Sequence, residues 1–253
     1  MFRVNSTRVE DGSQTTHKVL LYSHHGFGKT YQCRFFEKRY GKGLILSGES
    51  GLKSVEDVSI DYIEFKSYDG PHDPENNVYS FRQTVGEILK SIKAGEFPYA
   101  WIALDSLTEL GDQCLKHHQS EQSKLEKQDG FKVWGNYKAS MLGALTQLRD
   151  MPIHVYVTCL AKEEDDTSTG LTHYWPMLQS SAVMKQVPAI FDHVFCGVRS
   201  TEKSDSTVKV SRYIITEELD GWHGKARDPR NTLSAMEKVS DITELLERIT
   251  KGE

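Results

Sequence analysis

The fold is decided by the stretch His17-Lys18-Val19-Leu20-Leu21-Tyr22-Ser23-His24-His25-Gly26-Phe27-Gly28-Lys29-Thr30. Its first part, Lys18 to Tyr22, is a short apolar run of the kind that forms a buried parallel strand. The chain then enters a turn that contains two glycines, and the residues after Thr30 favour a helix. A strand that ends in G-x-G-K-T and leads into a helix is the context in which phosphate-binding loops occur.

Such a loop depends on small residues, because they let successive backbone N–H groups converge on an anion. Lys29 then reaches the β- and γ-phosphates, and the Thr30 hydroxyl binds Mg²⁺. The full pattern has glycine at position 23, where this chain has a serine, which is also small and tolerates turns. We therefore interpret the loop as intact, with ATP and Mg²⁺ as its ligands. The predicted nucleotide-binding residues are Ser23, His24, His25, Gly26, Phe27, Gly28, Lys29, Thr30 and Tyr31.

The composition is that of a polar globular protein. The chain has 253 residues, which is enough for one large domain with a sizeable core. Its net charge of −5 argues against a constitutively basic nucleic-acid coat protein, although local patches can still bind phosphates. The four cysteines are scattered without a C-x-x-C pair, a pattern typical of a reducing compartment. No apolar run approaches the roughly 20 residues that span a bilayer, so we expect a cytoplasmic protein without a membrane partner.

Strands and helices are predicted to alternate over the first 160 residues, which implies a parallel sheet with helices on both faces. The predicted strands are 18–22, 43–47, 62–65, 100–106, 153–159 and an antiparallel pair at 194–198 and 208–215. The predicted helices follow Thr30 and cover 81–92, 107–130, 134–148 and 241–249. Residues 160–187 are expected to be irregular, and residues 1–16 to form a leading strand or an arm that docks Phe2 on a neighbouring subunit.

Polar residues follow several of these strands, and ligands of parallel sheets sit beyond the carboxyl ends of the strands. Asp105 follows an apolar run, where a carboxylate would hold Mg²⁺; its alternative role is a helix N-cap. Glu49 is placed to activate the attacking water, although it could also be a solvated loop residue. Thr158 could bond the γ-phosphate or that water, or simply favour the strand.

A basic cluster at Lys225, Arg227 and Arg230 is the candidate for neutralising charge in the transition state, which is often done across a subunit interface. Three cations near a turn can equally form a solvated surface.

The order of these motifs resembles the RecA-type recombinase core, and most closely the short core-only RecA-like ATPases of phages. The resemblance covers residues 17–235 and implies a RecA-like P-loop core, α/β in class, with a mostly parallel twisted sheet and antiparallel strands added toward the C-terminus. It implies one RecA-like ATPase domain over 17–253. By the same resemblance Glu49 is the water-activating base, and Lys225 and Arg227 reach the γ-phosphate of a neighbouring subunit in a ring or filament.

In that family two mobile loops bind single-stranded DNA, and by position they would be 112–133 and 160–187. The first stretch also contains acidic residues, so an exposed helix is its alternative. Lysines and aromatic residues in both stretches suit phosphate neutralisation and base stacking. The candidate DNA-binding residues are Lys116, His117, His118, Lys124, Lys127, Lys132, Lys162, Tyr174, Trp175 and Lys185.

The resulting expectation is DNA-stimulated ATP hydrolysis by a homo-oligomer in phage-type DNA recombination or strand annealing, with a single-strand-binding protein as an additional partner. Two alternatives remain open. One is a motor or loader ATPase of DNA replication or packaging, and the other is a nucleotide-switched assembly protein with slow turnover. A small-molecule kinase is less favoured, because the 160–187 stretch contains no arginine for a lid.

Overall fold

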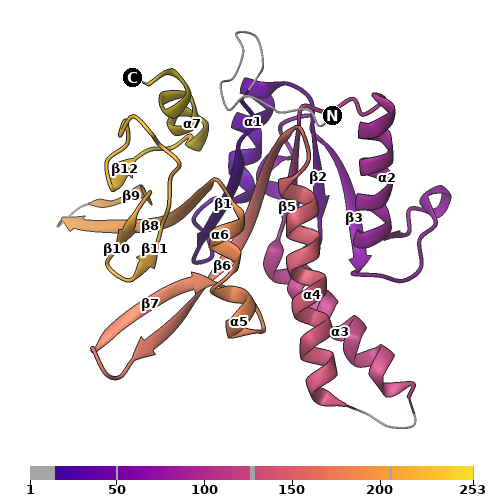
Figure 1. The fold of residues 1–253 in the computed structure, drawn as a ribbon. Helices are drawn as coiled ribbons and strands as arrows, with labels where there is room; N and C mark the ends of the chain where they lie inside the picture. Colours follow the sequence, from indigo (N-terminus) through magenta and orange to yellow (C-terminus); the bar gives the residue numbers. More distant parts are fainter. Residues whose placement is uncertain (1–14, 50, 126–128, 205–206, 253) are drawn as a thin grey trace, which may run out of the picture.

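Strand β1 (Lys18–Ser23) lies in the interior of a twisted sheet, as the computed structural model shows (Figure 1). The structure describes residues 15–49, 51–125, 129–204 and 207–252, so the predicted arm with Phe2, and Lys127, lie outside the described residues. The sheet has the strand order β12-β9-β8-β1-β6-β5-β2-β3-β4. The other strands of this path are β2 (Gly43–Ser47), β3 (Asp61–Ser67), β4 (Tyr79–Ser80), β5 (Trp101–Asp105), β6 (His154–Asp166), β8 (His193–Ser204), β9 (Thr207–Ile215) and β12 (Met236–Lys238).

The pairing is parallel from β8 through β1, β6, β5, β2 and β3 to β4. It becomes antiparallel where β9 joins β8 and where β12 joins β9. Three shorter strands, β7 (Leu171–Pro176), β10 (Glu218–Leu219) and β11 (Trp222–His223), form a side branch that reaches the sheet through β6. The predicted fold class, a mostly parallel α/β sheet with antiparallel strands toward the C-terminus, is confirmed.

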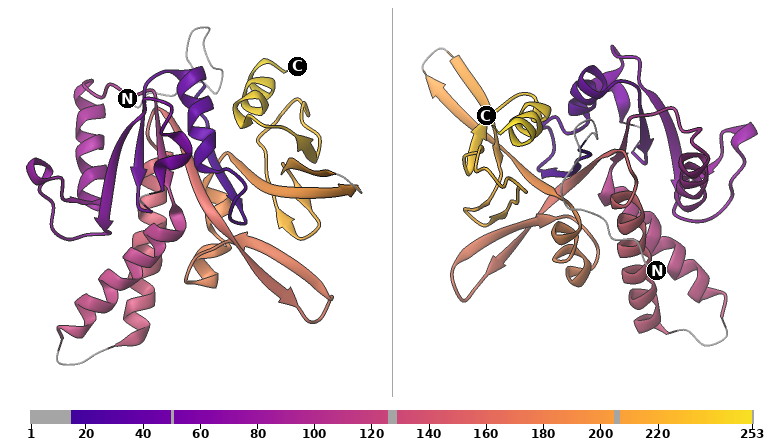
Figure 2. Two further views of the ribbon diagram at one scale, coloured as in Figure 1. Left: turned by 180° about the vertical axis from the view of Figure 1, so that it is seen from behind. Right: turned by 45° about the horizontal axis from the view of Figure 1, so that its top comes forward.

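Helices cover both faces of this sheet (Figures 1 and 2). Successive residues of β1 point to opposite faces, so Leu20 and Tyr22 join one buried cluster while Val19 and Leu21 join the other. The first cluster packs under α2 (Phe81–Ala94), α3 (Leu107–Ser123) and α4 (Gly130–Arg149), together with the short α5 (Ser181–Met184) and α6 (Val187–Ile190). The second lies under α1 (Cys33–Tyr40) and α7 (Ile242–Lys251). Single-turn 3-10 helices are η1 (Thr30–Gln32), η2 (Leu52–Val55) and η3 (Pro74–Asn76).

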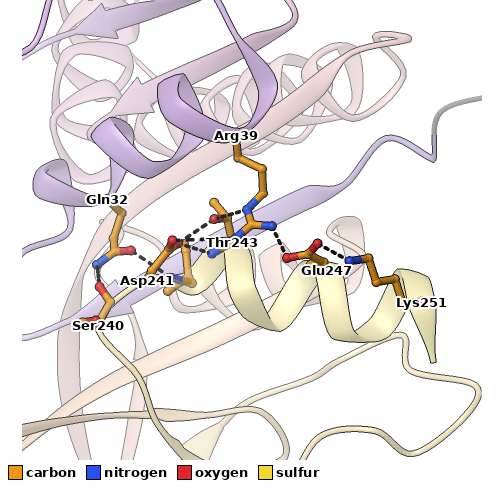
Figure 3. Close-up of polar contacts among 8 residues, drawn as sticks. Gln32, Arg39, Ser240, Asp241, Thr243, Glu247 and Lys251 are labelled. Carbon is orange, nitrogen blue, oxygen red and sulfur yellow. Dashed lines mark hydrogen bonds and ion pairs between the residues drawn. The ribbon is translucent and has the colours of Figure 1, made fainter. Parts of the chain in front are cut away.

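The C-terminal helix α7 is joined to the helix that follows the phosphate loop (Figure 3). Asp241 caps α7 by accepting a hydrogen bond from the Thr243 N–H at 2.7 Å. The Gln32 side chain accepts from the Ile242 N–H at 3.0 Å, and Arg39 donates to the Thr243 hydroxyl at 2.7 Å. The last helix of the chain therefore supports the segment that carries the loop.

Two stretches that were expected to form loops contain regular elements instead. Residues 112–133 are mostly helical, since α3 runs to Ser123 and α4 begins at Gly130, which agrees with the alternative of an exposed helix. Residues 160–187 are also ordered: β6 continues to Asp166 and returns as β7 in an antiparallel hairpin, and α5 and α6 follow. Within the described ranges no helix is long and apolar enough to cross a bilayer.

Candidate active site

The carboxyl ends of β1, β2 and β5, together with Leu160 in the middle of β6, lie around a cavity of about 270 Å³. Parallel pairing places these ends at one edge of the sheet, so residues far apart in the chain meet there. The cavity is lined by His25, Gly26, Gly28, Lys29, Thr30, Tyr31, Glu49, Ser54, Asp105, Ser106 and Leu160. The structure thus brings together the predicted loop, Glu49 and Asp105.

The loop takes the turn that its glycines permit. Gly26 has φ +72° and Gly28 has φ +105°, values that side-chain-bearing residues rarely adopt. Between them, the Phe27 side chain is buried against Gly197 of β8, where an added Cβ would lie 2.8 Å from the Phe27 ring. Tyr156 of β6 donates from its hydroxyl to the Lys29 carbonyl at 2.8 Å. The backbone of the loop is therefore held by the neighbouring strands.

The Lys29 ammonium group lies at the start of the loop and donates to the Ser23 carbonyl, the Ser23 hydroxyl and the His24 carbonyl, each at 3.2 Å. Burial lowers the pKa of Lys29, opposed by the nearby Cys159, Asp105 and Glu49. Ser23, which stands in place of the usual glycine, is fully buried. Its hydroxyl accepts a hydrogen bond from the Lys29 ammonium group.

Asp105 connects the loop to two strands. Its Oδ2 accepts a hydrogen bond from the Thr30 hydroxyl at 2.8 Å, and its Oδ1 accepts one from the Thr158 hydroxyl. The Thr158 side chain is fully buried and is not among the residues that line the cavity. Its observed partner is therefore Asp105, in place of the expected phosphate or water.

Glu49 lies across the cavity from the loop and accepts a hydrogen bond from the Ser106 hydroxyl. Ser106 also caps α3, since its hydroxyl accepts from the Glu109 N–H at 3.4 Å. Ser106 was not among the predicted site residues, although its place directly after Asp105 and ahead of a helix is typical of an N-cap. Glu49 is exposed, unlike Asp105, of which 4% is exposed.

The outer residues of the predicted loop have contacts of their own. His24 faces Glu163 of β6, with 3.5 Å between Nε2 and Oε1. Tyr31 lines the cavity and lies under the Arg34 guanidinium group, whose carbon is 3.9 Å from the ring centroid.

The basic cluster is not brought to this cavity. Lys225 pairs through its backbone with Val194, which lies opposite Leu20 in the interior of β1, and its ammonium group donates to the Pro188 carbonyl at 3.1 Å. Arg227 forms an ion pair with Asp192 at 3.0 Å. Within the described chain, neither cation reaches the loop of its own subunit.

The donors at the cavity suit Mg²⁺, which prefers oxygen ligands. The Thr30 hydroxyl and the Asp105 carboxylate are adjacent oxygen donors on the cavity wall, next to the loop N–H groups that would hold phosphate. The residues present therefore fit this ion.

Comparison with known proteins agrees with this geometry. The AAA domain family matches residues 15–227. The chain belongs to the AAA domain family. This match covers the loop, Glu49, Asp105, Lys225 and Arg227, and it supports a P-loop ATPase. None of the curated proteins matched the sequence.

Two solved structures resemble the chain at low identity. One is a prototypical ATPase from the type III secretion system of pathogenic bacteria, with 15% identity, a TM-score of 0.38 and coverage of 71% of this chain and 51% of that chain. The other is the flagellar accessory protein FlaH from Methanocaldococcus jannaschii, with 10% identity, a TM-score of 0.34 and coverage of 83% and 84%. This chain thus spans about half of the secretion ATPase. Both scores are low, so the conclusions below rest on the family match and the site.

Proposed function

We propose that this protein is a Mg²⁺-dependent ATPase that works as an oligomer on single-stranded DNA. The observation that carries the ATPase part of the proposal is the contact between the Thr30 hydroxyl and Asp105, made on the wall of a cavity that Lys29 and Glu49 also line. A phosphate-binding loop, a metal-binding carboxylate and a candidate base around one cavity are the parts that ATP hydrolysis requires.

Each group has a distinct task in this proposal. The loop N–H groups and Lys29 bind the β- and γ-phosphates, and Lys29 leaves its three oxygen partners to do so. Thr30 and Asp105 hold the Mg²⁺, which supplies charge that offsets the negative phosphate oxygens. Thr158 orients Asp105 through its hydrogen bond.

Glu49 acts as the general base toward the attacking water. Asp105 is engaged by two threonine hydroxyls, whereas Glu49 is exposed at the cavity and is held by Ser106. A carboxylate with free hydrogen-bonding capacity toward the cavity is better placed to accept a proton from water. Replacing Glu49 by glutamine keeps the shape and removes the base.

Lys225 and Arg227 act on the nucleotide of the neighbouring subunit. Their distance from the loop of their own chain supports a role across an interface, since Lys225 pairs at the level of Leu20. A Lys225→Ala variant should lower turnover and leave nucleotide affinity nearly unchanged. Equal loss of both would contradict the assignment.

DNA binding is proposed for the α3–α4 hairpin, which projects beyond the sheet (Figure 1). Its tip exposes Phe131 at 91% and Trp134 at 44%; Lys132 lies between them in the sequence, and Lys124 follows the end of α3. Exposed aromatic rings and cations suit stacking on bases and contact with phosphates.

The β6–β7 hairpin is a weaker candidate than expected. Its Trp175 ring stacks on His223 at 3.6 Å between centroids, and its Tyr174 ring stacks on Trp222 at 4.3 Å. Both aromatic side chains are thus engaged within the protein. The strand also carries four successive acids, Glu163 to Asp166, which would repel a DNA backbone.

The test is phosphate release with single-stranded DNA, with duplex DNA and without DNA. The proposal expects Mg²⁺-dependent release that single strands stimulate and that Glu49→Gln abolishes. A Phe131→Ala/Trp134→Ala variant should lose stimulation but keep the DNA-free rate, with Leu125→Ala at the same tip as the matched aliphatic control. ATP binding without release would instead favour a nucleotide-switched assembly protein, and unchanged stimulation in the aromatic variant would exclude this DNA surface.

A further inference from the structure

The middle of the phosphate loop contains two glycines, which give its backbone conformational freedom, and contacts with neighbouring strands restrict that freedom. Phe27 stands between Gly26 and Gly28, and glycine backbone has more conformational freedom than any other. Binding an anion requires that the N–H groups of such a loop already point inward, because ordering them on binding costs affinity. The buried Phe27 side chain fixes one point of the loop, but it does not orient the two peptide groups on either side.

Two arginines donate hydrogen bonds to the carbonyls of these peptide groups. Arg199 of β8 donates from Nη1 to the Gly26 carbonyl at 3.3 Å, and Arg212 of β9 donates from Nε to the Phe27 carbonyl at 2.9 Å. The two arginines lie directly opposite each other in the β8–β9 pair. Like charges at directly opposite positions destabilise a sheet, so the arrangement needs acceptors that offset the repulsion between the two guanidinium groups. The loop carbonyls are these acceptors.

These contacts bear on anion binding through the geometry of the peptide bond. The Gly26 carbonyl belongs to the peptide that carries the Phe27 N–H, and the Phe27 carbonyl belongs to the peptide that carries the Gly28 N–H. In a trans peptide the C=O and N–H bonds point in opposite directions. A cation held on each carbonyl therefore turns the N–H away from itself and polarises it toward an anion on the far side.

We propose that Arg199 and Arg212 are positioning residues that hold the phosphate loop in its anion-binding conformation. Nucleotide affinity then depends on the β8–β9 ribbon, which is distant from the loop in the sequence. The inference rests on the proposed binding of nucleotide at this loop. Neither arginine is among the residues that line the cavity, so both act through the loop backbone.

The experiment compares full-length variants by titration with a fluorescent ATP analogue and by steady-state phosphate release. In Arg199→Gln/Arg212→Gln the Kd and the KM should rise about tenfold, the loss expected for charge-assisted hydrogen bonds. The kcat should stay within about twofold, because neither arginine touches a reacting atom. Arg212→Lys keeps the charge but loses the Nε donor, and should show an intermediate affinity.

The control matched in charge to Arg212→Gln is Lys209→Gln, since each removes one positive charge from β9 and Lys209 lies nearer the tip of the ribbon. The Kd of Lys209→Gln should equal that of the unmodified protein. An unchanged Kd in the double variant would overturn the inference, and so would an equal loss in Lys209→Gln, since the effect would then be one of overall charge. If circular dichroism shows that the double variant is unfolded, the same comparison is made with Arg212→Gln and Arg212→Lys.

Failure of the inference is distinguishable from failure of the proposed function. A Lys29→Ala variant with undiminished affinity would refute nucleotide binding at the loop itself. Loss of affinity in Lys29→Ala with full affinity in the arginine variants would refute only the role of the β8–β9 ribbon.

Discussion

Lys18 and Lys29 lie near opposite ends of β1. Both ammonium groups donate hydrogen bonds to protein oxygens, but only Lys29 lines the cavity. Lys18, at the amino end, donates to the Met151 carbonyl at 2.6 Å, and Lys29, beyond the carboxyl end, donates to three loop oxygens at 3.2 Å. Burial lowers the pKa of both, that of Lys18 to about 8. A lowered pKa therefore does not tell them apart. Lys29 lines a cavity, whereas the bonds of Lys18 are shorter and lie inside the protein.

The histidines around Lys18 are also buried and hydrogen-bonded to one another. His17 lies 3.2 Å from His193 between ring nitrogens, and its backbone N–H donates to the His154 ring at 3.2 Å. All three are at least 95% buried. These groups bond to one another at a closed end of the sheet, while the groups at the other end surround open space. Of these two polar clusters, only the one around Lys29 has hydrogen-bonding groups at a cavity, where a ligand can reach them.

The largest effect is expected when Lys29, the lysine at the cavity, is replaced. Lys29→Ala should lower phosphate release about 10²–10³-fold, the loss typical for a group that stabilises developing charge. Its urea unfolding midpoint should fall less than that of a Lys18 variant, because the bonds that it loses are 3.2 Å long, against 2.6 Å for the bond from Lys18 to the Met151 carbonyl. Near-normal phosphate release in this variant would place the chemistry elsewhere.

The second prediction concerns pH. Burial lowers the pKa of His17 and His154 to about 4 and that of His193 to about 3. Between pH 6.5 and pH 4 the unfolded chain therefore binds more protons than the folded one, so stability falls as the pH falls. One shift of this size is worth about 3 kcal/mol.

Urea unfolding at pH 7.5 and pH 5.0 measures the part of this loss that is reached by pH 5.0, about 2 kcal/mol for each histidine. His193→Gln should reduce the dependence on pH, because it removes one titrating group and keeps a polar side chain. A dependence identical in both proteins would show that other groups, such as the carboxylates, account for it.

The third prediction concerns Lys18, whose replacement should lower stability and leave activity unchanged. Lys18→Met should lower the free energy of unfolding by about 2 kcal/mol, since it leaves buried carbonyls of Met151 and Ile153 without their donor. Phosphate release per folded molecule should not change. A specific loss of activity here would mean that the amino end also takes part in the reaction.

The smallest effect is expected at Ser23. Ser23→Ala removes the hydroxyl that Lys29 contacts at 3.2 Å but leaves the Ser23 carbonyl in place. Nucleotide affinity should change by about threefold or less, the value of one exchangeable hydrogen bond. A change as large as that of Lys29→Ala would instead make the serine an essential part of the loop.

Much of the fold was predictable because its signals are local. The apolar run before Ser23 forms β1, and the run before Asp105 forms β5, each with its polar residue at the carboxyl end. Glu49 could be placed beside them because parallel pairing brings strand ends together. The roles of these residues, and those of Lys225 and Arg227, stay predictions.

The structural features that were predicted wrongly or missed are those that arise from contacts between segments far apart in the chain. The 160–187 stretch looked irregular because nothing local shows that Tyr174 and Trp175 stack on Trp222 and His223. Arg199, directly after one predicted strand, and Arg212, within the other, were not selected as site residues. Their importance appears only when β8 pairs with β9 beside the loop.

By itself the sequence determined the phosphate loop, the order of most strands and helices, and the polar residues at the strand ends. All of these follow from spacing within a few residues. Only the tertiary structure decided which polar groups face a cavity and which are closed off, and which side chains hold the loop from behind. The physical reason is that a hydrogen bond or a cavity depends on positions in space, and sheet pairing here joins residues that lie more than a hundred positions apart in the chain.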